Sequence, residues 1–329
     1  MDTIGDVTIP CDQGLFVSNI RAYIKGKMDL VREVKVDGYV LRIANPDKLL
    51  YPEESITKWD YVLACVRLAP YLLRYTSKRL LTVVRYPDGV HHSYFFQKNA
   101  PTPCPDWVNT KKVGGIEYII LDNLPTLVWL ANLACLEFHT SFHYYGNERP
   151  TELVFDLDPS SSDFAKVVEV ALETKKVLER LNLMSYVKTS GASGLQIYIP
   201  IKAGYTFEET RQVNFFIAKY LTERLPDLVT MNRRISERGE KVYFDYLQHW
   251  RKKTMIAPYS PRATKKATVS TPLTWQELAE LSSPEVFTLK TIHERLTKKG
   301  DLFSPLLEGP RMDLTEILRF LEQHRIYRL

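Results

Sequence analysis

The sequence predicts an α+β fold, in which a small mixed β-sheet is flanked by helices. The first observation is the order of the patterns between Glu152 and Tyr246, which runs strand, helix, strand, strand, helix, strand. The second is size: 329 residues with 45% hydrophobic content can bury a substantial core, in one large domain or two small ones.

In the first half of the chain, residues 1–37 are interpreted as an N-terminal extension or linker with a helical stretch around Val17–Lys25. Thr57 is placed to cap a helix from Lys58 to Tyr75, because a threonine oxygen can accept the free N–H groups of a first turn. The other predicted elements are strands at Tyr39–Ala44, Leu80–Arg85, Ser93–Gln97 and Tyr118–Leu121, a turn at 87–89, and an apolar helix at Pro125–Leu136 that ends near Phe138 and His139.

In the second half, apolar residues at helical spacing predict helices at Phe164–Leu181 and Phe207–Leu225. The predicted strands are Leu153–Leu157, Met184–Thr189, Leu195–Ile201 and Lys241–Tyr246, with a glycine turn at Ser190–Gly194. A segment rich in Pro, Ser, Thr and Lys at 257–272 precedes a mainly helical C-terminal part. We expect a main domain at 38–305 and a helical segment at 306–329 packed on it.

The composition favours a protein of the cytoplasm and argues against several classes of site. A net charge of +5 and a pI near 8.8 are compatible with nucleic-acid binding and equally with an ordinary solvated surface. Cys11, Cys65, Cys104 and Cys135 are scattered without zinc-ligand spacing, so they are expected to be reduced and mostly buried thiols. No signal peptide and no membrane span are expected.

Two motifs carry acidic residues on predicted strands. Asp156 and Asp158 alternate around Leu157, so they share one face of a strand and repel unless a cation lies between them. An ordinary turn at the strand end is the alternative interpretation. Asp245 interrupts an apolar run, either as half of a buried ion pair with an arginine or as a third ligand. Three carboxylates can hold two divalent ions about 4 Å apart.

Two further segments have the composition of phosphate and nucleic-acid contacts. The turn containing Ser190, Gly191 and Ser193 can direct N–H groups and hydroxyls toward phosphate oxygens, or it can be an ordinary hairpin. Adjacent Phe95 and Phe96 point to opposite faces, so one can stack on a base beside phosphate-binding Lys98, unless a loop buries both.

The combination of these blocks resembles the polymerase domain of prokaryotic ligase D, the end-joining branch of the archaeo-eukaryotic primase superfamily. The matching blocks run in order from about residue 39 to 305, and they are NPDKLLYPEESITK, VVRYPDGV, FFQKNAP, NLPTLVWLANLACLEFH, VFDLDP, KTSGASGLQIYIPI, VYFDYLQ and IAPYSPRA followed by VSTPLTW.

The resemblance implies a primase-like core with an RRM-like mixed sheet. It also implies a polymerase that fills gaps and extends 3′ ends at double-strand breaks in non-homologous end joining, with a preference for ribonucleotides. Two Mn²⁺ ions, or Mg²⁺ in their place, are the expected cofactors. The expected partners are DNA ends with a 5′-phosphate, NTP or dNTP, Ku and an ATP-dependent DNA ligase, with association to the nucleoid.

The resemblance also assigns roles to residues. Asp156, Asp158 and Asp245 match the catalytic metal ligands, and Asn45, Lys48 and Lys58 match a pocket for the 5′-phosphate. Phe95 and Phe96 match an aromatic pair beside the nascent base pair, with Lys98 next to them. The expected nucleotide-binding residues are Arg85, His139, Ser190, Gly191, Ser193, Gln196, Arg238, Gln248 and Arg262.

Three positions depart from the family pattern. Gln196 replaces a frequent histidine, Ser193 a common lysine, and Val84 a lysine that often precedes Arg85. Glutamine donates a hydrogen bond but carries no charge. These departures leave a DNA end-bridging module with weak polymerase activity as one alternative function. A primase is another, because starting a chain needs the same metals and nucleotide pocket as extending one.

Overall fold

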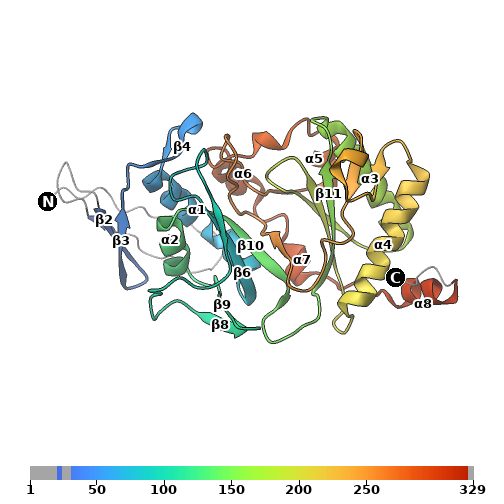
Figure 1. Ribbon diagram of the computed structural model, residues 1–329, viewed down its shortest axis with the longest axis horizontal. Coiled ribbons are helices and arrows are strands. Elements are labelled where there is room, and N and C mark those ends of the chain that lie inside the picture. Colours follow the sequence, from blue (N-terminus) through green and yellow to red (C-terminus); the bar gives the residue numbers. More distant parts are fainter. Residues whose placement is uncertain (1–20, 24–30, 325–329) are drawn as a thin grey trace.

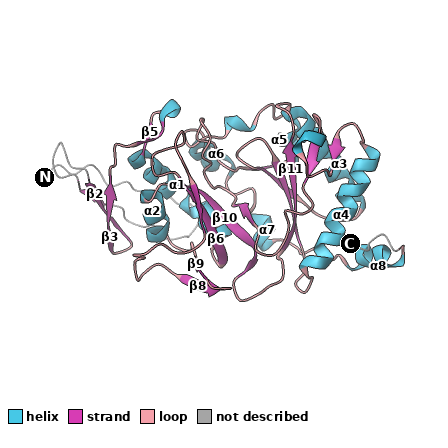
Figure 2. Ribbon diagram, viewed as in Figure 1, coloured by secondary structure: helices cyan, strands magenta, loops and turns pink. Residues whose placement is uncertain are grey.

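The computed structural model describes residues 21–23 and 31–324, and it confirms the α+β prediction (Figures 1 and 2). Two main sheets are present. The four-stranded sheet has the order β16 (Thr254–Ile256), β10 (Cys135–Tyr144), β6 (Arg79–Arg85), β7 (Phe95–Gln97). The six-stranded sheet has the order β14 (Val229–Thr230), β15 (Val242–Phe244), β11 (Glu152–Pro159), β13 (Leu195–Pro200), β12 (Tyr186–Thr189), β17 (Pro272–Leu273).

Each sheet has its own pair of covering helices. In Figure 1, α1 (Lys58–Thr76) and α2 (Leu124–Asn132) lie on the side of the four-stranded sheet, and α3 (Phe164–Arg180) and α4 (Phe207–Arg224) lie on the side of the six-stranded sheet. Thr57 caps α1 in a capping box with Asp60, as the sequence predicts. The C-terminal helices are α5 (Trp275–Ala279), α6 (Ile292–Lys299), α7 (Ser304–Glu308) and α8 (Thr315–Gln323).

Alternation along β11 separates a core face from a site face. Leu153, Phe155 and Leu157 are buried in the apolar core shared with α3 and α4. Val154 lies on the opposite face and belongs to the core that contains the four-stranded sheet. Asp156 and Asp158 therefore point away from α3 and α4, toward the space between the two sheets.

The start of the described chain differs from the sequence prediction. Arg21–Tyr23 forms strand β1 rather than helix, and the rest of the predicted stretch Val17–Lys25 lies outside the described residues. β1 pairs with β2 (Val31–Val36), which forms a hairpin with β3 (Tyr39–Ala44). This hairpin has residues on both sides of the 37/38 limit. The domain limits at 37/38 and 305/306 stay predictions.

The apolar segment after Pro125 is the main correction. α2 ends at Asn132, Ala134 turns the chain with a φ of 55°, and Cys135 begins the ten-residue strand β10. The predicted helix continued instead to Leu136 and ended near His139. Both faces of β10 are largely buried, so the segment has no polar alternation that distinguishes a strand from a helix.

The remaining strands are short and form two small sheets. β4 (Leu49–Tyr51) pairs with β5 (Ile56–Thr57), and β8 (Thr110–Val113) pairs with β9 (Ile116–Ile119). Cys65 and Cys135 are buried free thiols and Cys104 is half-buried, as expected, while Cys11 lies outside the described residues. None of the helices in residues 21–23 and 31–324 is long and apolar enough to span a membrane.

Candidate active site between the two sheets

The backbone places the three predicted metal ligands on one face of the six-stranded sheet. β11 and β15 pair so that Asp158 lies opposite Tyr243, and the Asp245 N–H donates to the Asp156 carbonyl at 2.9 Å. Asp245, directly after the end of β15, is therefore across from Asp156. Burial raises the pKa of Asp156, and Asp158 and Asp245 raise it further because like charges repel. Burial and Asp245 raise the pKa of Asp158 in the same way.

The Asp245 carboxylate is turned toward its own strand end. Its Oδ1 accepts hydrogen bonds from the Tyr243 hydroxyl at 3.1 Å and the Leu247 N–H at 3.0 Å. In the described part of the chain, Asp245 Oδ1 is thus occupied by Tyr243 and Leu247, and the ion pair of Arg262 is with Glu137 instead. No group of three or more His, Cys, Asp or Glu side chains there converges closely enough to hold a metal ion as they stand.

The residue types at this face fit a divalent ion. Two half-buried carboxylates on one strand face repel one another, and a cation between them removes that repulsion. Carboxylate oxygens are the ligands that Mg²⁺ and Mn²⁺ prefer. Asp245 would complete the set by turning away from Tyr243, because the pairing of β11 and β15 already holds its backbone beside Asp156.

Gln196 connects the carboxylates to the other sheet. It lies across from Asp156 on β13, and its Nε2 donates to Asp156 Oδ1 at 3.1 Å. The same nitrogen contacts the sulfur of Met255 on β16, in the four-stranded sheet. Its Oε1 is buried without a hydrogen-bond partner among the described residues. Lys188, across from Gln196 on β12, is fully buried and donates to the Ser270 hydroxyl.

The predicted phosphate turn lies between the carboxylates and Arg262. The Ser190 hydroxyl accepts the N–H groups of Ala192 and Gly194, both at 3.1 Å. A Cβ atom on Gly194 would lie 3.1 Å from Asp158 Oδ1, and one on Gly191 would lie 2.5 Å from Arg262 Cγ. The turn therefore packs against Asp158 on one side and half-buried Arg262 on the other.

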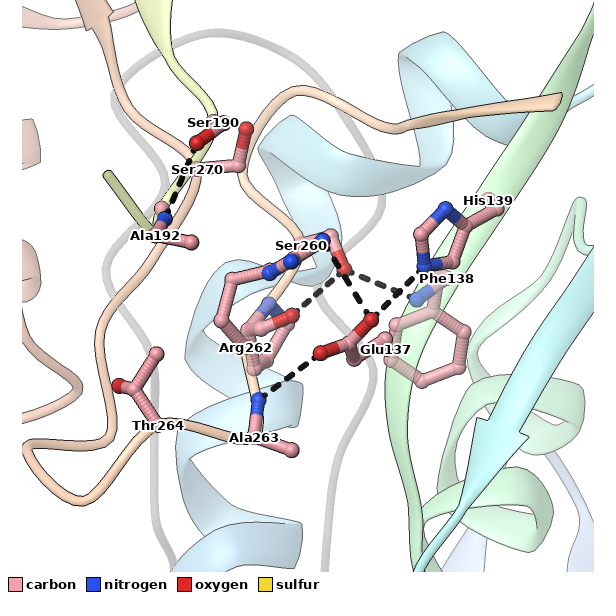
Figure 3. Close-up of polar contacts among 12 residues, drawn as sticks. Glu137, Phe138, His139, Ser190, Ala192, Ser260, Arg262, Ala263, Thr264 and Ser270 are labelled. Carbon is pink, nitrogen blue, oxygen red and sulfur yellow. Dashed lines mark hydrogen bonds and ion pairs between the residues drawn. The ribbon is translucent and has the colours of Figure 1, made fainter. Parts of the chain in front are cut away.

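Arg262 and His139 meet at a glutamate that the sequence analysis did not single out (Figure 3). Glu137 Oε2 lies 2.9 Å from His139 Nε2 and 3.4 Å from Arg262 Nη1. Burial lowers the pKa of His139, although Glu137 opposes this effect. Arg238 stacks over the Tyr243 ring at 3.7 Å, and both Arg238 and Arg262 lower the pKa of Asp158.

A second group of cations lies where the 5′-phosphate pocket is predicted. Lys58 is buried at the first turn of α1, and burial lowers its pKa, as do the charges of Lys48 and Arg85. Lys48 Nζ donates to the Pro87 carbonyl at 3.0 Å and to Asp88 Oδ1 at 2.7 Å. Lys58 is therefore close enough to two other cations to feel their charge, while Lys48 is also paired with Asp88, and the 5′-phosphate pocket stays a prediction.

The aromatic pair is exposed. Phe95 is 45% exposed and Phe96 64%, so the alternative in which a loop buries both is wrong. The Arg85 guanidinium lies over the Phe95 ring at 5.2 Å. Tyr94, also exposed, stacks on Tyr86 and meets Phe96 edge to face.

Of the four remaining predicted residues, three are exposed and one is half-buried. Asn45, Lys98 and Ser193 are exposed, and their roles stay predictions. Gln248 is half-buried, and its Nε2 donates to the Thr254 carbonyl at 3.0 Å.

Comparison with known proteins gives the family. Residues 57–303 match the model of the LigD primase-polymerase domain. The chain belongs to the LigD primase-polymerase family. It is 40% identical over 286 residues to the bifunctional non-homologous end joining protein LigD of Bacillus subtilis, covering 86% of this chain and 47% of that protein. It is 34% identical over 279 residues to the multifunctional LigD of Mycolicibacterium smegmatis, covering 81% of this chain and 36% of that protein.

A solved structure supports the same fold. The polymerase domain of Mycobacterium tuberculosis ligase D in complex with DNA superimposes with a TM-score of 0.75 at 31% identity, over 81% of this chain and 97% of that one. The chain thus spans about half, or less, of the length of the LigD proteins it matches, but nearly all of a solved LigD polymerase domain.

Proposed function

We propose that this LigD primase-polymerase domain is a template-directed nucleotidyltransferase. It would fill gaps and extend 3′ ends at DNA double-strand breaks in non-homologous end joining, together with Ku and an ATP-dependent ligase. The observation that carries the proposal is the arrangement of Asp156, Asp158 and Asp245 on one sheet face, beside a phosphate-type turn and Arg262.

The carboxylates would hold two divalent ions, Mn²⁺ in preference to Mg²⁺. Bound there, such ions activate a primer 3′-hydroxyl and neutralise the triphosphate and the leaving pyrophosphate. The chain's own part is to bring Asp245 beside Asp156 and Asp158 and to keep the turn against Asp158. Gln196 holds Asp156 in one orientation through its amide hydrogen bond.

The cations around the acidic face would bind the nucleotide. Arg262 and Arg238 approach Asp158, and Ser190 and Gly191 supply polar groups of the turn between them. A triphosphate in this position receives charge-assisted hydrogen bonds, which are stronger than neutral ones. The attack of the 3′-hydroxyl on the α-phosphate then places new charge next to fixed cations.

The second cation group would bind the DNA end. Lys58, Lys48 and Arg85 together provide positive charge for a 5′-phosphate on the downstream strand. Phe95 lies next to this group, because the Arg85 guanidinium is over its ring, and both Phe95 and Phe96 are exposed. The two rings would stack against the nascent base pair. The domain would thus bind a gap at the downstream 5′-phosphate and at the nascent base pair.

The test is nucleotide addition opposite a templating base in a 5′-phosphorylated gap. ATP and dATP are compared with Mn²⁺ and with Mg²⁺, for the wild type, Asp156→Ala/Asp158→Ala, and Asp227→Ala as an exposed carboxylate control. We expect template-directed addition by the wild type and control, faster with ATP, and none by the double variant. Tight gap binding without addition under either metal would replace the polymerase with an end-bridging module.

A further inference from the structure

Glu137 is a buried carboxylate that joins the two halves of the proposed nucleotide site. It lies on β10 with 8% exposure, and Figure 3 shows it between His139 and the segment that carries Arg262. One carboxylate oxygen accepts from His139 Nε2 at 2.9 Å and contacts Arg262 Nη1 at 3.4 Å. The other accepts from the Ala263 N–H at 3.2 Å.

The three partners of Glu137 are all hydrogen-bond donors. An ionised carboxylate only accepts, so it can serve His139, Arg262 and the Ala263 N–H at once. Burial alone would raise the pKa of Glu137, but His139, Arg262 and Ala263 outweigh burial and keep the pKa below its usual value. A glutamine of the same size would present its NH₂ group to at least one donor. The site therefore requires the acid itself.

Arg262 contacts Glu137 and still has an N–H donor that no group in the described part of the chain uses. Its Nε is buried without a hydrogen-bond partner in the described residues, and its contact to Glu137 is long for an ion pair. Its Cγ packs against Gly191 of the turn. The guanidinium thus lies between β10 and the turn, and it has a buried N–H that no group of the described residues pairs with and that a bound anion would satisfy.

We propose that Glu137 is a positioning residue for the nucleotide's triphosphate: it orients His139 and Arg262 together and does not itself touch the nucleotide. The inference rests on the proposed polymerase function. Glu137 acts before the nucleotide arrives, because two cationic or donating side chains without an anion between them would move apart. Its effect should therefore appear in nucleotide binding more than in the chemical step.

Glu152 offers a matched control. It is also a buried glutamate, 1% exposed, and it pairs with buried Arg79 at 2.7 Å at the start of β11. Its contacts involve none of the proposed nucleotide-binding residues. Glu152→Gln should lower the melting temperature without changing the KM for ATP, whereas Glu137→Gln should change the KM.

The experiment measures kcat and KM for ATP in Mn²⁺ on the 5′-phosphorylated gap, with the melting temperature of each variant. We expect Glu137→Gln to raise KM about tenfold or more, the scale of one lost charged hydrogen bond, with kcat within about threefold of wild type. Glu137→Asp keeps an acceptor-only group on a shorter arm, so its KM should lie between those of wild type and Glu137→Gln.

An unchanged KM in a folded Glu137→Gln variant would overturn the inference. If that variant does not fold, an unchanged KM in Glu137→Asp would do the same. Equal KM increases in Glu137→Gln and Glu152→Gln would assign Glu137 a purely structural role. These outcomes all require an active wild type, whereas failure of the wild type to add nucleotides would refute the proposed function instead.

Discussion

Gly191→Ala tests whether the turn and Arg262 fit together as closely as their contacts indicate. Gly191 has a φ of +76°, and a Cβ atom there would lie 2.5 Å from Arg262 Cγ and 2.8 Å from the Ser270 nitrogen. The left-handed conformation costs an alanine about 1 kcal/mol. The steric overlap adds about 1–3 kcal/mol, as in an overpacked core. The variant should therefore lose about 2–4 kcal/mol of unfolding free energy.

Gly146→Ala separates the two contributions. Gly146 has a φ of +79°, and a Cβ atom there would meet nothing within 4 Å. It should lose only the conformational part, about 1 kcal/mol. Urea unfolding of both variants and the wild type measures the difference. Because Arg262 must shift in Gly191→Ala, its KM for ATP should also rise. Equal destabilisation of the two variants, within about 0.5 kcal/mol, would refute the packing argument.

Four further variants probe the carboxylates, Gln196, the aromatic pair and the 5′-phosphate pocket. Burial and Asp158 raise the pKa of Asp156 above that of the same acid in the unfolded chain, which ionises at about pH 4. The metal-free protein therefore loses stability as the pH rises from about 4 through the raised pKa of the folded state. Asp156→Asn should thus be more stable than wild type to urea at pH 7 in EDTA, yet add nucleotides at least about a hundredfold more slowly; lower stability would contradict this. Gln196→His should keep or raise the addition rate, and a large loss in a single-turnover assay would contradict our account of that position. Phe96→Ala should weaken gap binding roughly 5- to 150-fold, the scale of one lost base stack, with no change in melting temperature because Phe96 is 64% exposed. Lys58→Met should remove the preference for a 5′-phosphate over a 5′-hydroxyl and reduce the salt dependence of binding by about one ion, measured by anisotropy.

The fold was most predictable where local signals agree. Thr57 caps α1, which begins at Lys58, and the helices α3 and α4 begin at Phe164 and Phe207 as the apolar spacing predicts. The alternation that places Asp156 and Asp158 on one face is local too, so the sequence alone predicts it. The approach of Arg262 to Gly191 is not local, because it depends on how a segment 71 residues further along packs on the turn.

The carboxylate geometry was only partly predictable for a related reason. Strand pairing brings Asp245 beside Asp156, which the pattern of an acid in an apolar strand suggests. Tyr243 and Asp245 lie on the same face at the end of one strand, so whether their side chains form a hydrogen bond depends on the rotamers that they adopt. A tyrosine two residues before a carboxylate is too common to predict such a contact.

The error over β10 and the omission of Glu137 have the same cause. On a helix, residues 137 and 139 would point about 200° apart around the axis, so their pairing is invisible if the segment is assigned as helical. On a strand, side chains at i and i+2 share a face, and Glu137 meets His139 at 2.9 Å. The turn that ends α2 is made by Ala134 with a positive φ, and alanine carries no sequence signal for that conformation. The sequence did contain a clue: Glu137 and His139 are separated by one apolar residue, inside a run that is too apolar for an exposed helix face. It favours a buried strand, because only there do both polar groups satisfy one another.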